Sequence, residues 1–91
     1  MRVIWSPLGK ADLFEIIDRI ALERPRAALG IYDRINARVG RLADFPFSGP
    51  ESTRRPPLRQ LTISGTPYLV FYRIDGDVVR VIAIFDGRRS D

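Results

Sequence analysis

The spacing of apolar residues in the first half of the chain predicts a short strand followed by a helix. Residues 2–5 form an apolar run that ends at Ser6-Pro7, a pair typical of a helix start, with Ser6 as the N-cap and Pro7 at the first helical position. From Leu8 to about Arg24, apolar residues recur at intervals of three and four. This spacing places them on one face of an amphipathic helix.

A second amphipathic helix follows at once, so we expect an antiparallel helical hairpin. The residue before Pro25 avoids the helical region, which ends the first helix, whereas Pro25 can open the second, which runs to about Ala43. Residues 44–57 contain four prolines and no regular pattern, and we predict a loop there. We expect Phe45 and Phe47 to hold this loop against the core.

The second half of the chain has the pattern of three strands. Residues 58–63 are predicted as one strand and residues 64–66 as a turn. Two apolar runs rich in β-branched and aromatic residues then flank Asp75-Gly76 within residues 67–89. Asp-Gly between such runs is a strong signal for a two-residue turn, so this segment is predicted to be a β-hairpin.

The two faces of the predicted hairpin differ in character. One is apolar apart from its tip and is expected to be buried; its facing pairs are Ile74 with Asp77, Tyr72 with Val79, Val70 with Val81 and Tyr68 with Ala83. The other is apolar with arginines toward the tip; it consists of Leu69, Phe71, Arg73, Val78, Arg80, Ile82 and Ile84. An apolar face with positive charge at one end indicates a binding surface.

The fold class that follows is α+β. A small antiparallel sheet carries an N-terminal helical hairpin packed on one face, in the order β-α-α-β-β-β. We assign residues 1–91 to one domain, because a chain this short buries only roughly 60–65% of its unfolded surface and has no room for a second core. The N-terminus lacks the layout of a signal peptide and no apolar run is long enough for a membrane span, so we expect a cytoplasmic protein.

Charge narrows the class of partner. The formal net charge is +4, and residues 54–91 hold seven basic and four acidic residues, so the positive excess lies with the strands. This distribution favours an anionic partner such as nucleic acid, a protein that handles nucleic acid, or an acidic peptide. The chain has no cysteine and no histidine, which removes the thiolate nucleophile, the usual general base and the usual zinc site. We therefore expect neither a metal nor a cofactor.

The arginines near the C-terminus also have simpler interpretations. Arg73 and Arg80 can act as edge charges that discourage pairing between molecules, and Arg88 and Arg89 can belong to a solvated tail. Asp86 is interpreted first as a turn residue.

The whole pattern resembles the RelE/ParE toxins of bacterial type II toxin-antitoxin modules. The matching pieces, in order, are a strand ending in Trp5, A-D-L-x-E-I-x-x-x-I-A from Ala11 to Ala21, P-x-A-A from Pro25 to Ala28, L-x-x-x-P from Leu42 to Pro46 with Gly49, R-x-L from Arg59 to Leu61, Y-L-V-F-Y-R-I, D-V-V-R-V-I-A-I-F and G-R-R. The resemblance implies the same layout that the residues predict. It also implies two alternative activities.

One branch of this family, the RelE-like one, cleaves messenger RNA on the ribosome with a set of basic side chains. Arg59 and Arg89 match two of those positions, whereas Leu61 and Tyr68 stand where further basic residues belong. Asp86 stands where many relatives have histidine, and the sequence ends before any tail tyrosine. Because several kcal/mol of transition-state stabilisation would be lost, at about 2.7–4 for each missing donor, we expect no catalytic residues unless the protein is such a ribonuclease.

The ParE-like branch matches more closely and implies a poison of DNA gyrase that acts by protein-protein contact and is not an enzyme. Its target-binding residues would be Arg73, Arg80, Arg88 and Arg89. An antitoxin would neutralise the toxin in a hetero-oligomer, covering apolar surface of the hairpin and sheet; its expected contacts are Leu69, Phe71, Ile82 and Ile84. A third alternative is a non-toxic relative that only binds an antitoxin.

Overall fold

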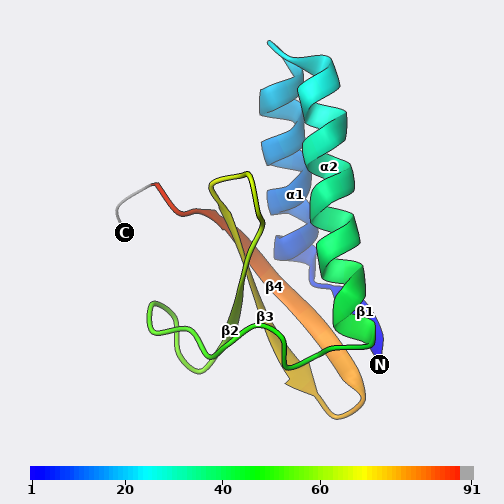
Figure 1. The fold of residues 1–91 in the computed structure, drawn as a ribbon, viewed down its shortest axis with the longest axis vertical. Coiled ribbons are helices and arrows are strands. Elements are labelled where there is room, and N and C mark those ends of the chain that lie inside the picture. The colour runs from blue at the N-terminus through cyan, green and yellow to red at the C-terminus, as the bar shows by residue number, and fades with distance from the viewer. Residues whose placement is uncertain (89–91) are drawn as a thin grey trace.

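The computed structural model describes residues 1–88 and contains two long helices beside a four-stranded sheet (Figure 1). The elements, in chain order, are β1 (Arg2–Trp5), α1 (Pro7–Ala21), α2 (Pro25–Gly40), the 3-10 helix η1 (Arg41–Ala43), β2 (Arg59–Thr62), β3 (Tyr68–Asp75) and β4 (Val78–Asp86). This order confirms the predicted α+β layout. No helix in the described part of the chain is both long and apolar enough to span a membrane.

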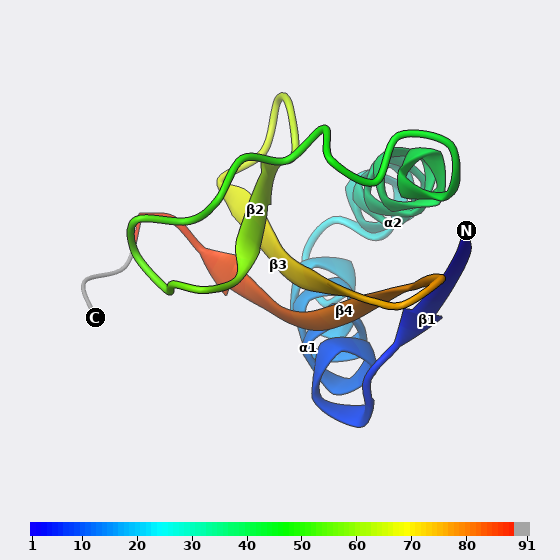
Figure 2. The same ribbon diagram turned by 90° about the horizontal axis from the view of Figure 1, so that it is seen from below.

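The sheet has the strand order β1-β4-β3-β2 and is mixed (Figure 2). β2, β3 and β4 pair antiparallel, as predicted, whereas β1 pairs parallel with β4. A single core cluster joins the apolar stripes of both helices to one face of the sheet; it includes Leu13, Ile16, Ile35, Val39, Leu42, Leu61, Ile63, Val70, Tyr72, Val79 and Val81. The sheet therefore rests on the helical hairpin through one face.

The start of α1 is fixed to the sheet by Ser6. Its Oγ accepts a hydrogen bond from the Gly9 N–H (3.0 Å), as expected for an N-cap, and donates one to the Ile82 carbonyl (3.0 Å). The Ser6 N–H donates to the Val81 carbonyl (2.9 Å). A Cβ on Gly9 would lie 3.0 Å from the same Val81 carbonyl oxygen, a tight contact that favours glycine at this close approach.

The turn of the hairpin lies one residue later than predicted. Asp75 pairs with Val78, so Gly76 and Asp77 form the two-residue loop. Gly76 has a φ of 60°, and no residue other than glycine has a positive φ in the described chain. This is the pattern of a type II′ turn, in which only the first loop residue needs a positive φ. The predicted turn would have required it of Asp75.

A β-bulge in β4 changes the predicted pairs. Tyr72 pairs with Val81 but Phe71 pairs with Ala83, so Ile82 is an additional residue in β4. Beyond the bulge, Ile84 moves to the core face opposite Val70, whereas Ala83 moves to the outer face. All four predicted pairs were wrong: the later turn already places Ile74 opposite Val79 and Tyr72 opposite Val81, and the bulge then places Val70 opposite Ile84 and Tyr68 opposite Asp86. Tyr72, Val79 and Val81 nevertheless share the buried face as expected.

The loop between η1 and β2 is held by Tyr72, and not by the two phenylalanines expected to anchor it. Phe45 and Phe47 are 60% and 66% exposed. The Tyr72 hydroxyl instead donates to the Pro46 carbonyl (2.7 Å) and accepts from the Gly49 N–H (2.9 Å). A side chain on the core face of β3 thus fixes the loop from inside.

Candidate functional site

The outer face of β3 and β4, where sequence predicted an open binding surface, is partly covered by the chain itself. Phe71 is fully buried. The guanidinium of Arg55 lies over the rings of Phe71 (5.6 Å) and Phe85 (4.8 Å), and that of Arg54 lies 5.8 Å from the centroid of Phe85. Such cation-π contacts are worth about 0.5–1 kcal/mol each at exposed sites. The loop before β2 therefore folds back over the aromatic part of this face.

This arrangement corrects the expected apolar contact surface. Of its four residues, Phe71 lies under the loop and Ile84 is only 6% exposed because the bulge places it in the core. Leu69 and Ile82 are half-buried. A partner could reach only these last two without displacing part of the fold, so the four residues do not form one exposed surface.

The two arginines at the hairpin tip share one carboxylate. Arg73 Nε and Arg80 Nε donate to the same oxygen of Asp75, at 2.9 and 3.0 Å. Hydrogen bonds from Arg80 and Arg73 hold the pKa of Asp75 below its ordinary value. These three side chains therefore form a compact ion cluster with a net charge of about +1, smaller than the charge of the two free cations suggested by the sequence.

Arg88 is folded onto the turn that ends β4. Its Nε and Nη2 donate to the two carboxylate oxygens of Asp86, at 3.1 and 2.9 Å, and its N–H also donates to Asp86 (2.9 Å). The side chain of Asp86 is 9% exposed and that of Arg88 72%. Asp86 thus has the predicted turn role and also orients Arg88. Arg89, the other predicted residue here, lies outside the described residues.

The side chain of Arg59, the remaining candidate from the sequence, contacts the loop before β2 and stabilises it. Its Nε donates to the Gly49 carbonyl (2.7 Å), and its guanidinium stacks on Phe47 at 5.1 Å. The side chain is therefore committed to the loop that Tyr72 anchors. The structure brings Arg73 and Arg80 together, and places Arg59 and Arg88 apart from them in separate clusters.

Asp12 on α1 is a polar contact that the sequence did not predict. Its Oδ2 accepts from the Ile84 N–H (2.9 Å), which β1 is too short to reach because it pairs with β4 only as far as Val81. Burial raises the pKa of Asp12; the hydrogen bond from Ile84 acts in the opposite direction, and the nearby charge of Glu15 raises the pKa further.

Asp12 and Glu15 line a small cavity of about 180 Å³. Within residues 1–88, no group of three His, Cys, Asp or Glu side chains could hold a metal ion.

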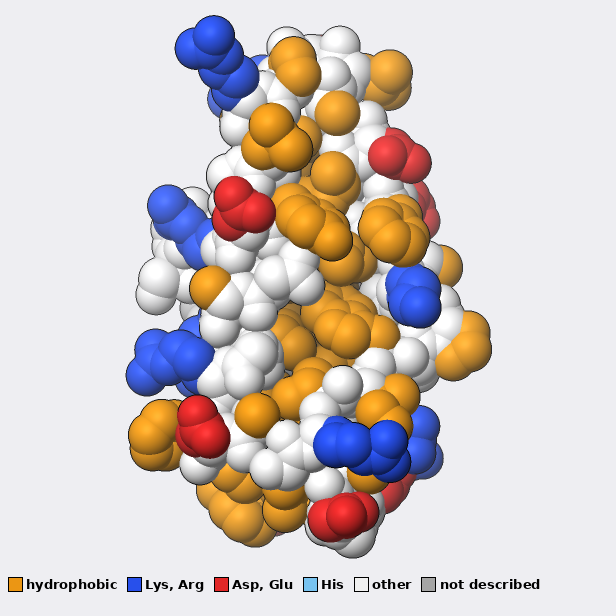
Figure 3. Space-filling model, turned by 90° about the vertical axis from the view of Figure 1, so that its right-hand side faces the viewer, with side chains coloured by type: hydrophobic (Ala, Val, Ile, Leu, Met, Phe, Trp, Pro, Cys, Tyr) orange, Lys and Arg blue, Asp and Glu red, His pale blue; other side chains and the backbone are white. Residues whose placement is uncertain are grey.

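Apolar side chains gather on the side of the molecule formed by the helices and β1. Figure 3 shows them in a hollow along this side, flanked by charged side chains. The helical hairpin of α1 and α2 projects beyond the sheet (Figure 1), so its outer half lacks a strand to pack on. Accordingly, apolar residues of β1 and both helices are only partly buried; they include Val3, Trp5, Ile17, Ile20 and Ile31, while Phe14, Leu22 and Leu29 are exposed. A contiguous apolar surface of this kind is typical of a protein interface.

Comparison with known proteins agrees with these features. Residues 3–91 match the family model described as ParE toxin of type II toxin-antitoxin system, parDE. The chain is 35% identical over 77 residues to a Sinorhizobium fredii protein named "Putative toxin Y4kP", a match that covers 85% of this chain and 79% of that protein. A chain in the solved structure of the chromosomal ParDE TA system from P. aeruginosa superposes with a TM-score of 0.83 at 26% identity, covering 94% of this chain and 95% of that one. The chain therefore belongs to the ParE toxin family of type II toxin-antitoxin systems.

Proposed function

We propose that this protein is a cytoplasmic toxin that inhibits DNA gyrase by direct protein-protein contact, without catalysis, and that a cognate antitoxin neutralises it in a hetero-oligomer. Membership of the ParE family supports the toxin and the antitoxin partner. The choice of a binding mechanism over RNA cleavage rests on one observation, the position of Arg59.

Arg59 is the one candidate for RNA cleavage within the described residues, and its guanidinium serves the fold. Its Nε donates to the Gly49 carbonyl and its plane lies against Phe47. A group that stabilises a phosphorane must aim its donors at the reacting phosphate, because one such donor is worth about 2.7–4 kcal/mol. Turning Arg59 toward RNA would break its loop contacts, which supports recognition over chemistry.

The charged hairpin tip and the C-terminal turn are the proposed contacts with gyrase. Arg73 and Arg80 remain partly exposed around Asp75, and Arg88 is oriented by Asp86 but stays largely in solvent. We assign Arg89 to the same contact from its sequence position. Oriented arginines lose less side-chain freedom on binding than free ones, which favours their use at an interface.

The antitoxin is proposed to cover the apolar hollow of Figure 3, together with Leu69 and Ile82. Phe71 and Ile84 are withdrawn from that interface because they are buried in the chain itself. Covering partly buried apolar residues contributes about 25 cal/mol for each Å² removed from water.

Induced expression in a bacterium tests the mechanism. Gyrase inhibition predicts a DNA damage response and filamentation, and the purified protein should inhibit supercoiling by gyrase in vitro. Rapid loss of translation with cleaved messages would show an endoribonuclease instead. Unimpeded growth at confirmed expression would refute both mechanisms and leave an antitoxin-binding protein without toxicity.

Variants of the C-terminal arginines test the proposed contact. Changing both Arg88 and Arg89 to alanine should reduce growth inhibition while leaving antitoxin binding largely intact. The matched control is Arg24→Ala with Arg26→Ala, which removes the same charge from the exposed junction of the two helices. Equal loss of toxicity and of antitoxin binding would mean that Arg88 and Arg89 support the fold, and equal effects of both double variants would mean that only net charge matters.

A further inference from the structure

The edge strand β2 is only half covered. It lies at the end of the sheet, with β3 as its neighbour. The loop before it pairs with the start of the strand: the Gln60 N–H donates to the Pro50 carbonyl (2.9 Å), and the Ser52 N–H to the Leu58 carbonyl (2.8 Å). No such pairing reaches the end of β2 in the described chain, so that end presents an open edge.

The open edge is centred on Thr62. Along an antiparallel strand, backbone groups point alternately to one neighbour and to the other. The Ile63 N–H donates inward to the Tyr68 carbonyl (3.1 Å) and the Gln60 N–H points outward to the loop, so the N–H and C=O of Thr62 also point outward. Within residues 1–88 neither backbone group of Thr62 has a hydrogen-bond partner.

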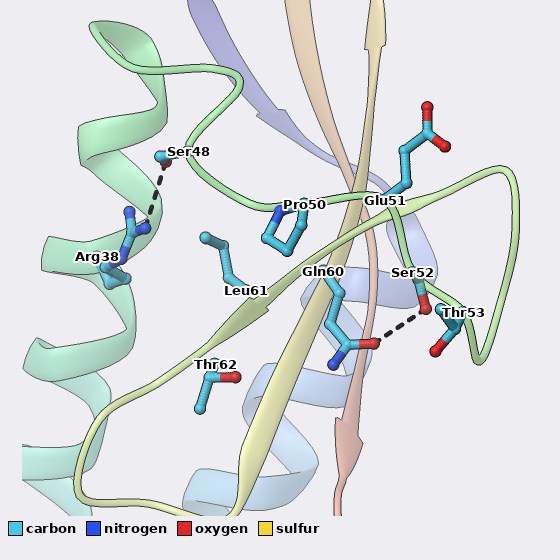
Figure 4. Close-up of a pocket in the computed structure, with 9 residues that line it drawn as sticks. All are labelled: Arg38, Ser48, Pro50, Glu51, Ser52, Thr53, Gln60, Leu61 and Thr62. Carbon is cyan, nitrogen blue, oxygen red and sulfur yellow. Dashed lines mark hydrogen bonds between the residues drawn. The ribbon is translucent and has the colours of Figure 1, made fainter.

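A row of arginines on α2 faces this edge. Arg38 lines two adjoining cavities of about 410 and 310 Å³, one bordered by Gln60, Leu61 and Thr62, the other by Ile63 and Ser64 together with Arg34 and Arg41. Figure 4 shows the first of them, with Arg38 and Ser48 on one side and β2 on the other. We call this continuous depression, between Arg34, Arg38 and Arg41 on α2 and residues 60–64, the α2–β2 groove.

The groove carries unbalanced positive charge. Arg34 donates to the Ser64 carbonyl (3.0 Å) and Arg38 to the Ser48 hydroxyl (3.2 Å), and both acceptors are neutral. Among residues 1–88, none of the three arginines has a carboxylate within ion-pair distance. Of the described residues that line the two cavities, Glu51 is the one acidic residue. An anionic ligand would therefore meet cations that are already positioned.

We propose that the α2–β2 groove binds an extended acidic segment of the antitoxin, which adds as a strand to β2 at Thr62 and turns carboxylates toward Arg34, Arg38 and Arg41. The identity of the partner rests on the proposed function. The extended form follows from the backbone donor and acceptor of Thr62, which are spaced for another strand. The acidic character follows from the arginines, which can hold carboxylates by paired hydrogen bonds.

The probe for this groove is an acetylated ten-residue peptide of alternating valine and glutamate, added to the isotope-labelled full chain. Binding should slow hydrogen exchange of the Thr62 amide at least tenfold, because that N–H acquires an acceptor. The same peptide N-methylated at its six central amides keeps its charge but cannot pair as a strand, and should give no protection. A peptide with lysine in place of glutamate should not bind.

Substitution of two groove arginines tests whether their charge contributes to peptide binding. Arg38→Gln with Arg41→Gln should weaken peptide binding about tenfold, as expected for two partly exposed ion pairs. The control pair Arg24→Gln with Arg26→Gln removes the same charge at the helix junction and should change affinity less than twofold.

The proposal is overturned if the acidic peptide does not bind, if it binds without protecting Thr62, or if the N-methylated peptide binds equally well. It is also overturned if a single-stranded oligonucleotide protects Thr62 better than the acidic peptide, which would indicate a nucleic-acid groove. Growth inhibition and gyrase supercoiling are measured separately: their absence refutes the proposed function and leaves the exchange result unaffected, whereas loss of Thr62 protection refutes the groove alone.

Discussion

Removing the hydroxyl of Tyr72 should detach the proline-rich loop from the sheet. In Tyr72→Phe the aromatic ring stays in the core, but the Gly49 N–H loses its acceptor and the Pro46 carbonyl loses its donor. Gly49 is buried, so its N–H cannot be rehydrated without movement of the loop, whereas Pro46 is half-buried and can regain water. A buried polar group left without a partner costs about 1–3 kcal/mol, and we expect a total loss of about 2 kcal/mol in the free energy of unfolding.

Urea unfolding followed by the fluorescence of Trp5 measures this loss. In a domain of this size, about 2 kcal/mol should lower the thermal midpoint by about 8–16 °C. The control is Tyr32→Phe, since the Tyr32 hydroxyl has no hydrogen-bond partner among residues 1–88, and we expect a change within about 0.5 kcal/mol. A Tyr72→Phe loss as small as that of the control, with the same slope against urea, would refute the anchoring role.

Three further changes probe other contacts. Asp12→Asn keeps an acceptor for the Ile84 N–H. Because burial raises the pKa of Asp12 above 3.8, the contribution of Asp12 to wild-type stability should be lost as pH rises through the folded pKa, and this loss should be absent from the variant in urea unfolding at pH 3–7. The pKa of Asp75 is lowered, so its stabilisation is complete above 3.8 and is lost as pH falls through the folded pKa; Asp75→Asn should be less stable than wild type at pH 7, and the difference should shrink as the pH is lowered below 3.8 in the same measurement. Gly65→Ala should lower the thermal midpoint in calorimetry, because Gly65 has a φ of 78°, a backbone conformation that strains any residue with a Cβ.

The parts of the fold predicted correctly are those set by neighbours in sequence. Ser6-Pro7 fixed the start of α1, Pro25 fixed the start of α2, and the 3.6-residue period located both apolar stripes. The hairpin was also predicted, but its turn was placed one residue early, because Asp-Gly and Gly-Asp both suit tight turns and the choice depends on which residue takes the positive φ.

Contacts between distant segments account for the errors. The bulge at Ile82 lies against Ser6, which precedes it by 76 residues, and nothing local in β4 marks it. That one additional residue moved Ile84 into the core and so removed it from the predicted binding face. Phe71 was lost from the same face because Arg55 folds back over it, which no periodicity in β3 reveals.

The charge of the sheet, counted from the sequence, differs from the charge that a partner would meet in the structure. Along the sequence, the positive excess lies with the strands, which directed attention to Arg73, Arg80 and Arg88. In the structure these three arginines pair with Asp75 and Asp86, so the local field of the sheet is weaker than the count of residues implies.

The arginines of α2 show the opposite effect. They lie in a segment whose overall charge is nearly balanced, yet within residues 1–88 the hydrogen bonds of the Arg34 and Arg38 side chains go to neutral oxygens, beside a strand edge whose Thr62 backbone groups have no partner there. Unpaired cations next to an open edge attract an extended anionic chain more strongly than cations already joined to carboxylates, because no ion pair must first be broken. An acidic partner should therefore be sought first along α2 and β2, and a target of another chemistry at the hairpin tip.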